Sequence, residues 1–196
     1  MSEKTLVQNL QKYKNINETS LHFICNLETL NMFPGFVHPF TCIIAGPTQS
    51  GKTYFLKRLL KALEFYIDPC PERIIWCFGI ENKEQMSFFE NCNLKVPIEF
   101  IEGLPIDIHK TISPKEKTLI ILDDLMQEIG QNSAMSTLFT RQSHHKNLSV
   151  IFVVQNFFHQ SKRMRDIHLS TNYIIFFKNP RDMSQIKVLD RQAFPN

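Results

Sequence analysis

The chain of 196 residues has the length of one α/β domain, and 43% of its residues are hydrophobic, which allows a sizeable core. Its formal net charge of +3 excludes a uniformly basic, histone-like protein, but it leaves room for a local basic patch that binds nucleic acid. The five cysteines form no CxxC pair. Their pattern therefore favours free thiols over a disulfide framework or a zinc site.

No apolar run approaches the ~20 residues needed to cross a bilayer. The N-terminal stretch "MSEKTLVQNLQKYKN" is too polar for a signal peptide. The sequence thus predicts a soluble, intracellular protein without a membrane partner.

Residues 1–36 differ in character from the rest and are expected to form an N-terminal extension packed on a main domain over 37–196. Leu6, Leu10 and Tyr13 have helical spacing before "NINETS" breaks the pattern. The following "FPGFVHP" is expected to be irregular.

Short apolar segments and helical segments then alternate along the chain. The expected buried strands are "FTCIIAG", "RIIWCFG", "IEFIEG", "TLIILDDL", "SVIFVVQNF" and "NYIIFFKN". One helix is expected after the first strand, with an apolar face of Phe55, Leu56, Leu59, Leu60 and Leu63. Further helices are expected at "EQMSFFENC", 133–145 and 182–193. Strands without polar alternation, separated by helices, predict a mainly parallel sheet flanked by helices on both faces.

A phosphate-binding motif follows the first predicted strand. The pattern G-x-x-x-x-G-K-[ST] is matched in full by Gly46, Pro47, Thr48, Gln49, Ser50, Gly51, Lys52 and Thr53. The two glycines allow backbone N–H groups to point at phosphate oxygens, and the helix that begins near the second one adds its positive dipole end. Lys52 can reach the β- and γ-phosphates of ATP, and the hydroxyl of Thr53 can bind Mg²⁺. The strand before the motif and the amphipathic helix after it support this interpretation.

A second strand ends in two acids. Asp123 is the expected partner of Mg²⁺, and Asp124 is placed to orient or deprotonate a water that attacks the γ-phosphate. Asp124 could instead only cap the next element. Many ATPases with this layout carry Glu at that position, and the shorter Asp must reach further.

The strand "SVIFVVQN" also ends in polar residues. Gln155 or Asn156 could touch the γ-phosphate or the attacking water, and Gln155 is preferred. The alternative is that both amides merely begin a loop. Guanine-specific proteins usually carry Asn-Lys-x-Asp, but the nearest match here, "NKEQ", has Gln85 in place of Asp and precedes the acid-bearing strand.

Several blocks occur in order along the chain: "HPFTCIIAGPTQSGKTYF", "LIILDDLM", "SHHKNLSVIFVVQNFFHQ", "STNYIIFFKNPRD" and "DRQAFP". Together they resemble the DNA-packaging ATPases of the FtsK–HerA superfamily. They are most similar to the type encoded by Polinton (Maverick) elements and related double-stranded DNA viruses, distant relatives of the poxvirus packaging ATPase. The resemblance runs from about residue 38 to residue 195.

The resemblance implies a P-loop NTPase with a RecA-like (ASCE) sheet, in which the polar-ended strand lies between the two nucleotide-binding strands. It implies a homo-oligomeric ring, such as a pentamer or hexamer, that uses ATP and Mg²⁺ to move double-stranded DNA into a capsid. A capsid or portal component would then be a partner, and the protein would act in the host nucleus, at a cytoplasmic assembly site or in the virion. Relatives often continue past "FPN", so a C-terminal helix that aids assembly is expected to be missing here.

The resemblance also implies that Gln155 falls on the family's sensor position and that an arginine from the adjacent subunit completes each site. Arg165 and then Arg141 are the candidates, and each could instead be a solvated surface residue. DNA would meet basic side chains without sequence reading. The densest basic groups are Lys162, Arg163 and Arg165, and His144, His145 and Lys146.

Two other functions stay open. One is a P-loop nucleotide kinase in which "KRMR" at 162–165 serves as a lid, although no acceptor pocket is evident. The other is a nucleotide-binding switch or assembly factor that hydrolyses ATP slowly, which Asp124 in place of Glu would allow.

Overall fold

The computed structural model of the chain describes residues 22–24, 35–79, 83–90, 92, 94–104, 112–126, 139, 147–158 and 162–177. The helical pattern near the N-terminus and the helix expected over 182–193 lie outside these residues. So does the helix expected over 133–145, apart from Phe139.

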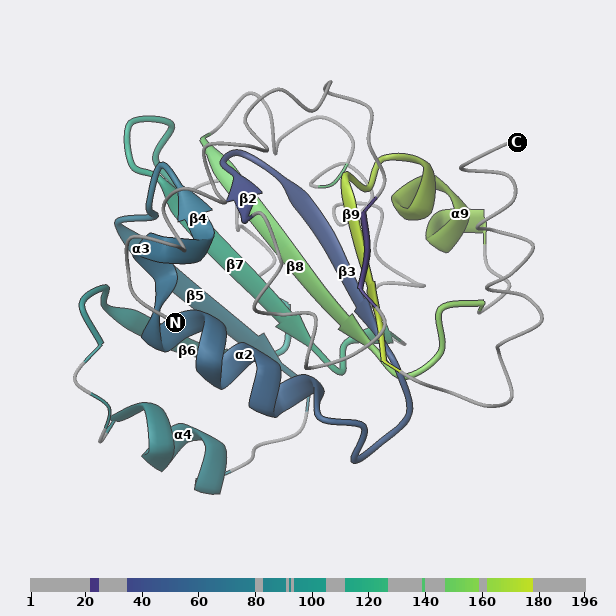
Figure 1. Ribbon diagram of the computed structural model, residues 1–196, viewed down its shortest axis with the longest axis horizontal. Helices are drawn as coiled ribbons and strands as arrows, with labels where there is room; N and C mark the ends of the chain where they lie inside the picture. The colour runs from purple at the N-terminus through teal and green to yellow at the C-terminus, as the bar shows by residue number, and fades with distance from the viewer. Residues whose placement is uncertain are drawn as a thin grey trace, which may run out of the picture.

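A seven-stranded parallel sheet forms the centre of the described fold, with the strand order β1-β9-β3-β8-β7-β5-β6 (Figure 1). Its strands are β1 (His22–Ile24), β3 (Thr41–Ala45), β5 (Arg73–Phe78), β6 (Ile98–Glu102), β7 (Thr118–Asp123), β8 (Leu148–Val154) and β9 (Tyr173–Phe176). Each apolar segment expected to be a strand is one, and the prediction of a mainly parallel sheet is confirmed. The strand β8 lies between β3 and β7, as the resemblance implied.

Three further strands were not expected from the sequence. β1 lies within the segment interpreted as an N-terminal extension, and it pairs with β9 at the edge of the central sheet. β2 (Phe36–Val37) pairs with β4 (Ile67–Asp68) in a separate two-stranded sheet. The expectation of an irregular "FPGFVHP" is therefore wrong for Phe36–Val37, while the domain boundary at residue 36 stays a prediction.

The described helices are α2 (Lys52–Lys61), α3 (Leu63–Tyr66), α4 (Lys83–Glu90) and α9 (Lys162–Leu169). The expected apolar face after the phosphate-binding motif is interrupted, because the backbone leaves helical geometry at Ala62 (φ −126°, ψ 37°). Leu63 therefore belongs to α3 and not to α2, although it is buried beside the α2 residues. The sequence pattern does not predict α9 as a helix, since its charged residues indicate a basic cluster or a lid.

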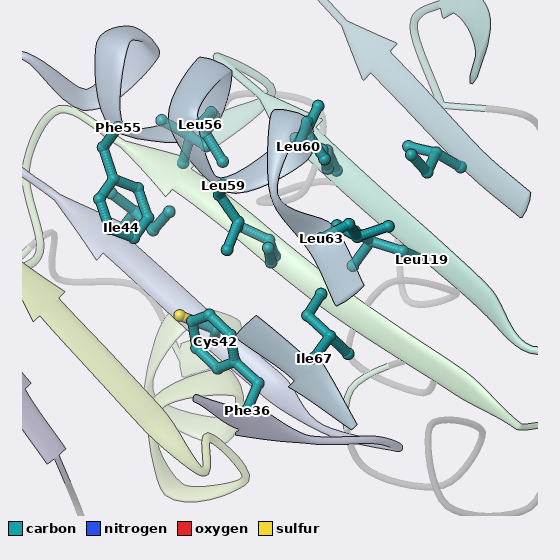
Figure 2. Close-up of a cluster of buried hydrophobic side chains, with 14 of the residues drawn as sticks. Phe36, Cys42, Ile44, Phe55, Leu56, Leu59, Leu60, Leu63, Ile67 and Leu119 are labelled. Carbon is teal, nitrogen blue, oxygen red and sulfur yellow. The ribbon is translucent and has the colours of Figure 1, made fainter. Parts of the chain in front are cut away.

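Both faces of the central sheet are packed, because alternate residues of β3, β5, β7, β8 and β9 belong to two different buried clusters. On one face, α2 places Phe55, Leu56 and Leu59 over Cys42 and Ile44 of β3 (Figure 2). On the other face, Met164 and Ile167 of α9 join the cluster that holds the intervening strand residues, among them Ile43, Ala45, Phe152 and Val154. These two packed layers fix the carboxyl ends of β3, β7 and β8 at one edge of the sheet.

Candidate functional site

The phosphate-binding loop joins β3 to α2. Its first residue continues the ladder, since the N–H of Gly46 donates to the carbonyl of Val154 on β8 (3.2 Å). The loop then turns, and the N–H of Ser50 donates to the carbonyl of Pro47 (3.2 Å). Gly51 has a φ of 102°, a left-handed value that favours glycine, and α2 begins at the next residue. The helix start expected near Gly51 is confirmed.

Gly46 has no room for a side chain. A Cβ built on it would lie 2.6 Å from the Cβ of Phe177 and 2.9 Å from the Oγ of Ser50. Phe177 is fixed there, because its N–H donates to the carbonyl of Ala45 (2.7 Å) and its ring packs edge-on against Phe55. Phe177, the residue that follows β9, thus packs against the start of the phosphate-binding loop, a contact that the sequence pattern does not indicate.

Lys52 folds over the loop that carries it. Its Nζ donates to the carbonyl oxygens of Gly46 (2.6 Å) and Pro47 (2.8 Å). Burial lowers the pKa of this amine, and the nearby Asp123 and Asp124 oppose that shift by attraction. The lysine is thus a half-buried cation at the loop, within the electrostatic reach of both acids.

The acids lie at the same edge of the sheet as the loop. Asp123, the last residue of β7, is in register with Val153 of β8, which in turn is in register with Ile44 of β3. Asp124 leaves the strand with a φ of 57°, a left-handed value that Asp tolerates better than most residues. Its carboxylate is exposed, as a group that meets a substrate must be.

The amides after β8 have different partners. Gln155 Nε2 donates to Asp124 Oδ1 (3.1 Å), which links the polar end of β8 to the acid that follows β7. Asn156 Oδ1 instead accepts from the N–H of Phe158 (2.9 Å) and closes a local turn. Gln155 thus contacts the acid that follows β7, whereas Asn156 is engaged in its own turn. The preference for Gln155 as the residue that acts at the site stays a prediction.

The donor set at this edge fits Mg²⁺. The hydroxyl of Thr53, exposed in the first turn of α2, and the carboxylate of Asp123 are hard oxygen donors, the kind that Mg²⁺ takes. These two residues would hold the ion. The metal itself would supply positive charge that stabilises the phosphate oxygens as they develop negative charge.

The remaining candidates are placed only in part. Arg165 is exposed on α9, which packs through Met164 and Ile167 on the other face of the sheet from α2. The side chains of Lys162 and Arg163 lie outside the described part of the chain, as do Arg141 and the group His144, His145 and Lys146. Their roles stay predictions.

A parallel sheet with a phosphate-binding loop after β3, acids after β7 and β8 between these strands defines a P-loop NTPase fold of the RecA-like type. The expected fold class is thus confirmed. Within the described residues, none of the helices has both the length and the apolar character to cross a membrane.

A comparison with curated proteins gives a viral relative of this chain. The chain is 29% identical over 159 residues to packaging protein 1 of Snake adenovirus serotype 1. That match covers 66% of this chain but only 35% of the viral protein. No family model matches the sequence.

Solved structures are similar in fold. The flagellar accessory protein FlaH from Methanocaldococcus jannaschii superposes with a TM-score of 0.52 at 13% identity, over 82% of this chain and 80% of FlaH. The genome packaging NTPase B204 from Sulfolobus turreted icosahedral virus 2, in complex with ATP-gammaS, has a TM-score of 0.48 at 16% identity. It matches 81% of this chain and 88% of that one. At 13% identity the likeness to FlaH concerns the fold alone.

Proposed function

We propose that this protein is a Mg²⁺-dependent ATPase that translocates double-stranded DNA during the packaging of a viral genome. The observation that carries the ATPase part is the hydrogen bond between Gln155 and Asp124 at the edge where the phosphate-binding loop lies (3.1 Å). It joins two of the parts that hydrolysis needs, an acid for water and a polar group for the γ-phosphate, and the phosphate-binding loop is the third. The similarity to an adenovirus packaging protein supports the DNA part.

Hydrolysis would use the described residues as follows. The backbone N–H groups of the loop and the Nζ of Lys52 bind the β- and γ-phosphates. Asp124 orients a water and takes its proton while the water oxygen bonds to the γ-phosphorus and the bond to the β-phosphate oxygen breaks. Gln155 donates to the γ-phosphate or to the attacking water. The products are ADP and phosphate.

Binding of ATP would require two exchanges of hydrogen bonds. Lys52 would leave the carbonyls of Gly46 and Pro47, and Gln155 would release Asp124 Oδ1. Both groups are then free to meet phosphate and water. A charged partner strengthens such bonds, so the phosphates can compete for the lysine.

The finer features of the proposal follow from the resemblance in the sequence. The protein would work as a homo-oligomeric ring of the Polinton-like viral type, with Arg165 or Arg141 reaching the site of the neighbouring subunit. Duplex DNA would meet the basic residues around 162–165 through its phosphates.

The test is ATP turnover by the purified protein with and without duplex DNA, with Mg²⁺ present or chelated. We expect Mg²⁺-dependent turnover that rises when DNA is added, and loss of turnover in Lys52→Ala. Lys115→Ala, an exposed change in the loop before β7, is the matched control and should match the wild type. An assembled ring with turnover that DNA does not stimulate would contradict the motor and favour the slow switch.

A further inference from the structure

Gly79, the residue after β5, lies against the backbone of the proposed acid. A Cβ built on Gly79 would lie 2.7 Å from the carbonyl oxygen of Asp124 and 3.4 Å from Cδ2 of Leu125. Real Cβ atoms essentially never approach a backbone atom as closely as the first distance. Any side chain at residue 79 would therefore move one of the two backbones.

Residue 79 needs to be glycine because a side chain would not fit there, and not because its backbone adopts angles that only glycine allows. The described glycines with a positive φ are Gly35, Gly51 and Gly103, and Gly79 is not among them. An alanine could adopt its backbone angles, but it could not share its position with the carbonyl of Asp124. A glycine that only ended a strand would need no such close approach.

Gly79 also contacts the preceding peptide group, on the other side of the Asp124 Cα. Its N–H donates to the carbonyl oxygen of Asp123 (3.1 Å), which extends the pairing of β5 with β7 by one residue. The chain then turns to the left-handed φ of 57° at Asp124. This turn directs the carboxylate of Asp124 to Gln155. The close contact with Gly79 thus fixes the main chain from which the acid projects.

We infer that Gly79 is a positioning residue for Asp124: it sets the place of the acid through the backbone and has no contact with the nucleotide itself. This inference rests on the proposed function, in which Asp124 handles the attacking water. It predicts that a single methyl group added at residue 79 slows hydrolysis. The affinity for ATP should be kept, because the phosphate-binding loop follows a different strand, β3.

The experiment compares Gly79→Ala, Asp124→Asn and the double variant in steady-state hydrolysis at varied ATP concentration and in ATP binding. We expect Gly79→Ala to lower kcat by about tenfold or more, because misplacement of a catalytic group by about 1 Å can slow a reaction by 10²-fold. The KM for ATP should stay within about twofold of the wild type, since the loop is unchanged. In the Asp124→Asn background, the alanine should slow the reaction no further. Ser113→Thr, a methyl group added in the exposed loop before β7, is the matched control.

Each other outcome overturns the inference in a recognisable way. If Asp124→Asn hydrolyses ATP as fast as the wild type, Asp124 is not the acid, and both the role assigned to it and the inference fail. If Asp124→Asn is slow but Gly79→Ala keeps its kcat, only the inference fails. Additive losses in the double variant would show that Gly79 does not act through Asp124. Loss of the fold or of ATP affinity in Gly79→Ala would mean that the glycine serves the sheet as a whole.

Discussion

At the scale of single residues, the phosphate-binding loop depends on a missing side chain. Gly46 is packed between Phe177 and Ser50, and a Cβ there would overlap with the Cβ of Phe177 at 2.6 Å. Because Phe177 is held by its own N–H and by its ring, it cannot move aside without disturbing β9. The loop would have to move instead.

We therefore expect Gly46→Ala to weaken ATP binding by about tenfold or more, since overpacking costs about 1–3 kcal/mol and the loop carries the binding groups. Titration with a fluorescent ATP analogue measures the loss. The double variant Gly46→Ala with Phe177→Gly is the matched test, because it removes the Cβ of Phe177, the nearer of the two atoms that the alanine would meet, and leaves the rotatable hydroxyl of Ser50. Binding that stays as weak in the double variant would contradict this explanation.

The adjacent amides allow a second test at the same scale. Gln155 bonds to Asp124, whereas Asn156 bonds to the N–H of Phe158 in its own turn. We expect Gln155→Ala to lower kcat by about 10²-fold, as the loss of a donor to a developing negative charge does elsewhere. Asn156→Ala should instead lower the thermal midpoint by a few degrees and leave kcat nearly unchanged. The reverse assignment of the two effects would make Asn156 the sensor.

At the scale of elements, the sequence predicts those strands that are buried along their whole length, because burial requires apolar residues. β3, β7 and β8 are buried along their length apart from Asp123, so their sequences are apolar except for that residue and the buried Thr41, Thr118 and Ser149. Two-residue strands such as β2 have no pattern that could reveal them. α9 is helical although charged residues surround the two apolar ones that it buries, Met164 and Ile167. Met164 and Ile167 have the i, i+3 spacing of one helical face, but a helix this short depends on its tertiary contacts.

The same limit applies to the site. Gly46, Lys52 and Asp123 could be found from the sequence because a motif and a strand end mark them. The contacts of Gly46 with Phe177 and of Gly79 with Asp124 join segments far apart in the chain. Nothing in the local pattern of either glycine shows which backbone lies against it. A single sequence gives residue types along the chain, whereas these roles depend on distances across the sheet.

α9 also carries a group that should make stability depend on pH. His168 stacks on Phe157 with ring centroids 4.0 Å apart, and burial lowers its pKa from 6.5 to about 4. The unfolded chain binds a proton near pH 6.5 and the folded chain only near pH 4, so the unfolded state holds more protons between these values. The stabilising effect of the neutral ring is complete above pH 6.5 and is lost as the pH falls through this window.

We therefore expect the free energy of unfolding to fall between pH 6.5 and pH 4 more steeply in the wild type than in His168→Phe. The phenylalanine keeps a ring stacked on Phe157 and cannot take up a proton. Urea unfolding at pH 7.0, 6.0 and 5.0 measures the difference, and the acids shared by both proteins cancel in the comparison. If the free energy of unfolding fell equally with pH in the two proteins, His168 would not contribute to the pH dependence of stability.

At the scale of the whole molecule, the proposed motor requires that one subunit completes the site of another. Arg165 is exposed on α9, on the other face of the sheet from α2. An arginine that stabilises phosphate charge from a neighbouring subunit would need such an outward position. A head-to-tail ring presents each subunit's arginine to the next subunit's loop.

This arrangement predicts that two inactive variants restore each other. Lys52→Ala lacks the lysine and Arg165→Ala lacks the arginine, so each alone should hydrolyse ATP very slowly. In a mixed ring, an Arg165→Ala subunit with an intact loop can receive the arginine of a Lys52→Ala neighbour. With equal amounts and random assembly, about one quarter of the interfaces hold this pair, so the mixture should recover up to about a quarter of the wild-type rate.

The control is a mixture of Lys52→Ala with Asp124→Asn. It restores nothing if both residues act in one subunit's site, since no site in such a mixture would hold both the lysine and the acid. Recovery in the first mixture without recovery in the second therefore places Arg165 across the interface. Assembled mixtures that stay inactive in both cases would leave Arg165 no role in its neighbour's site.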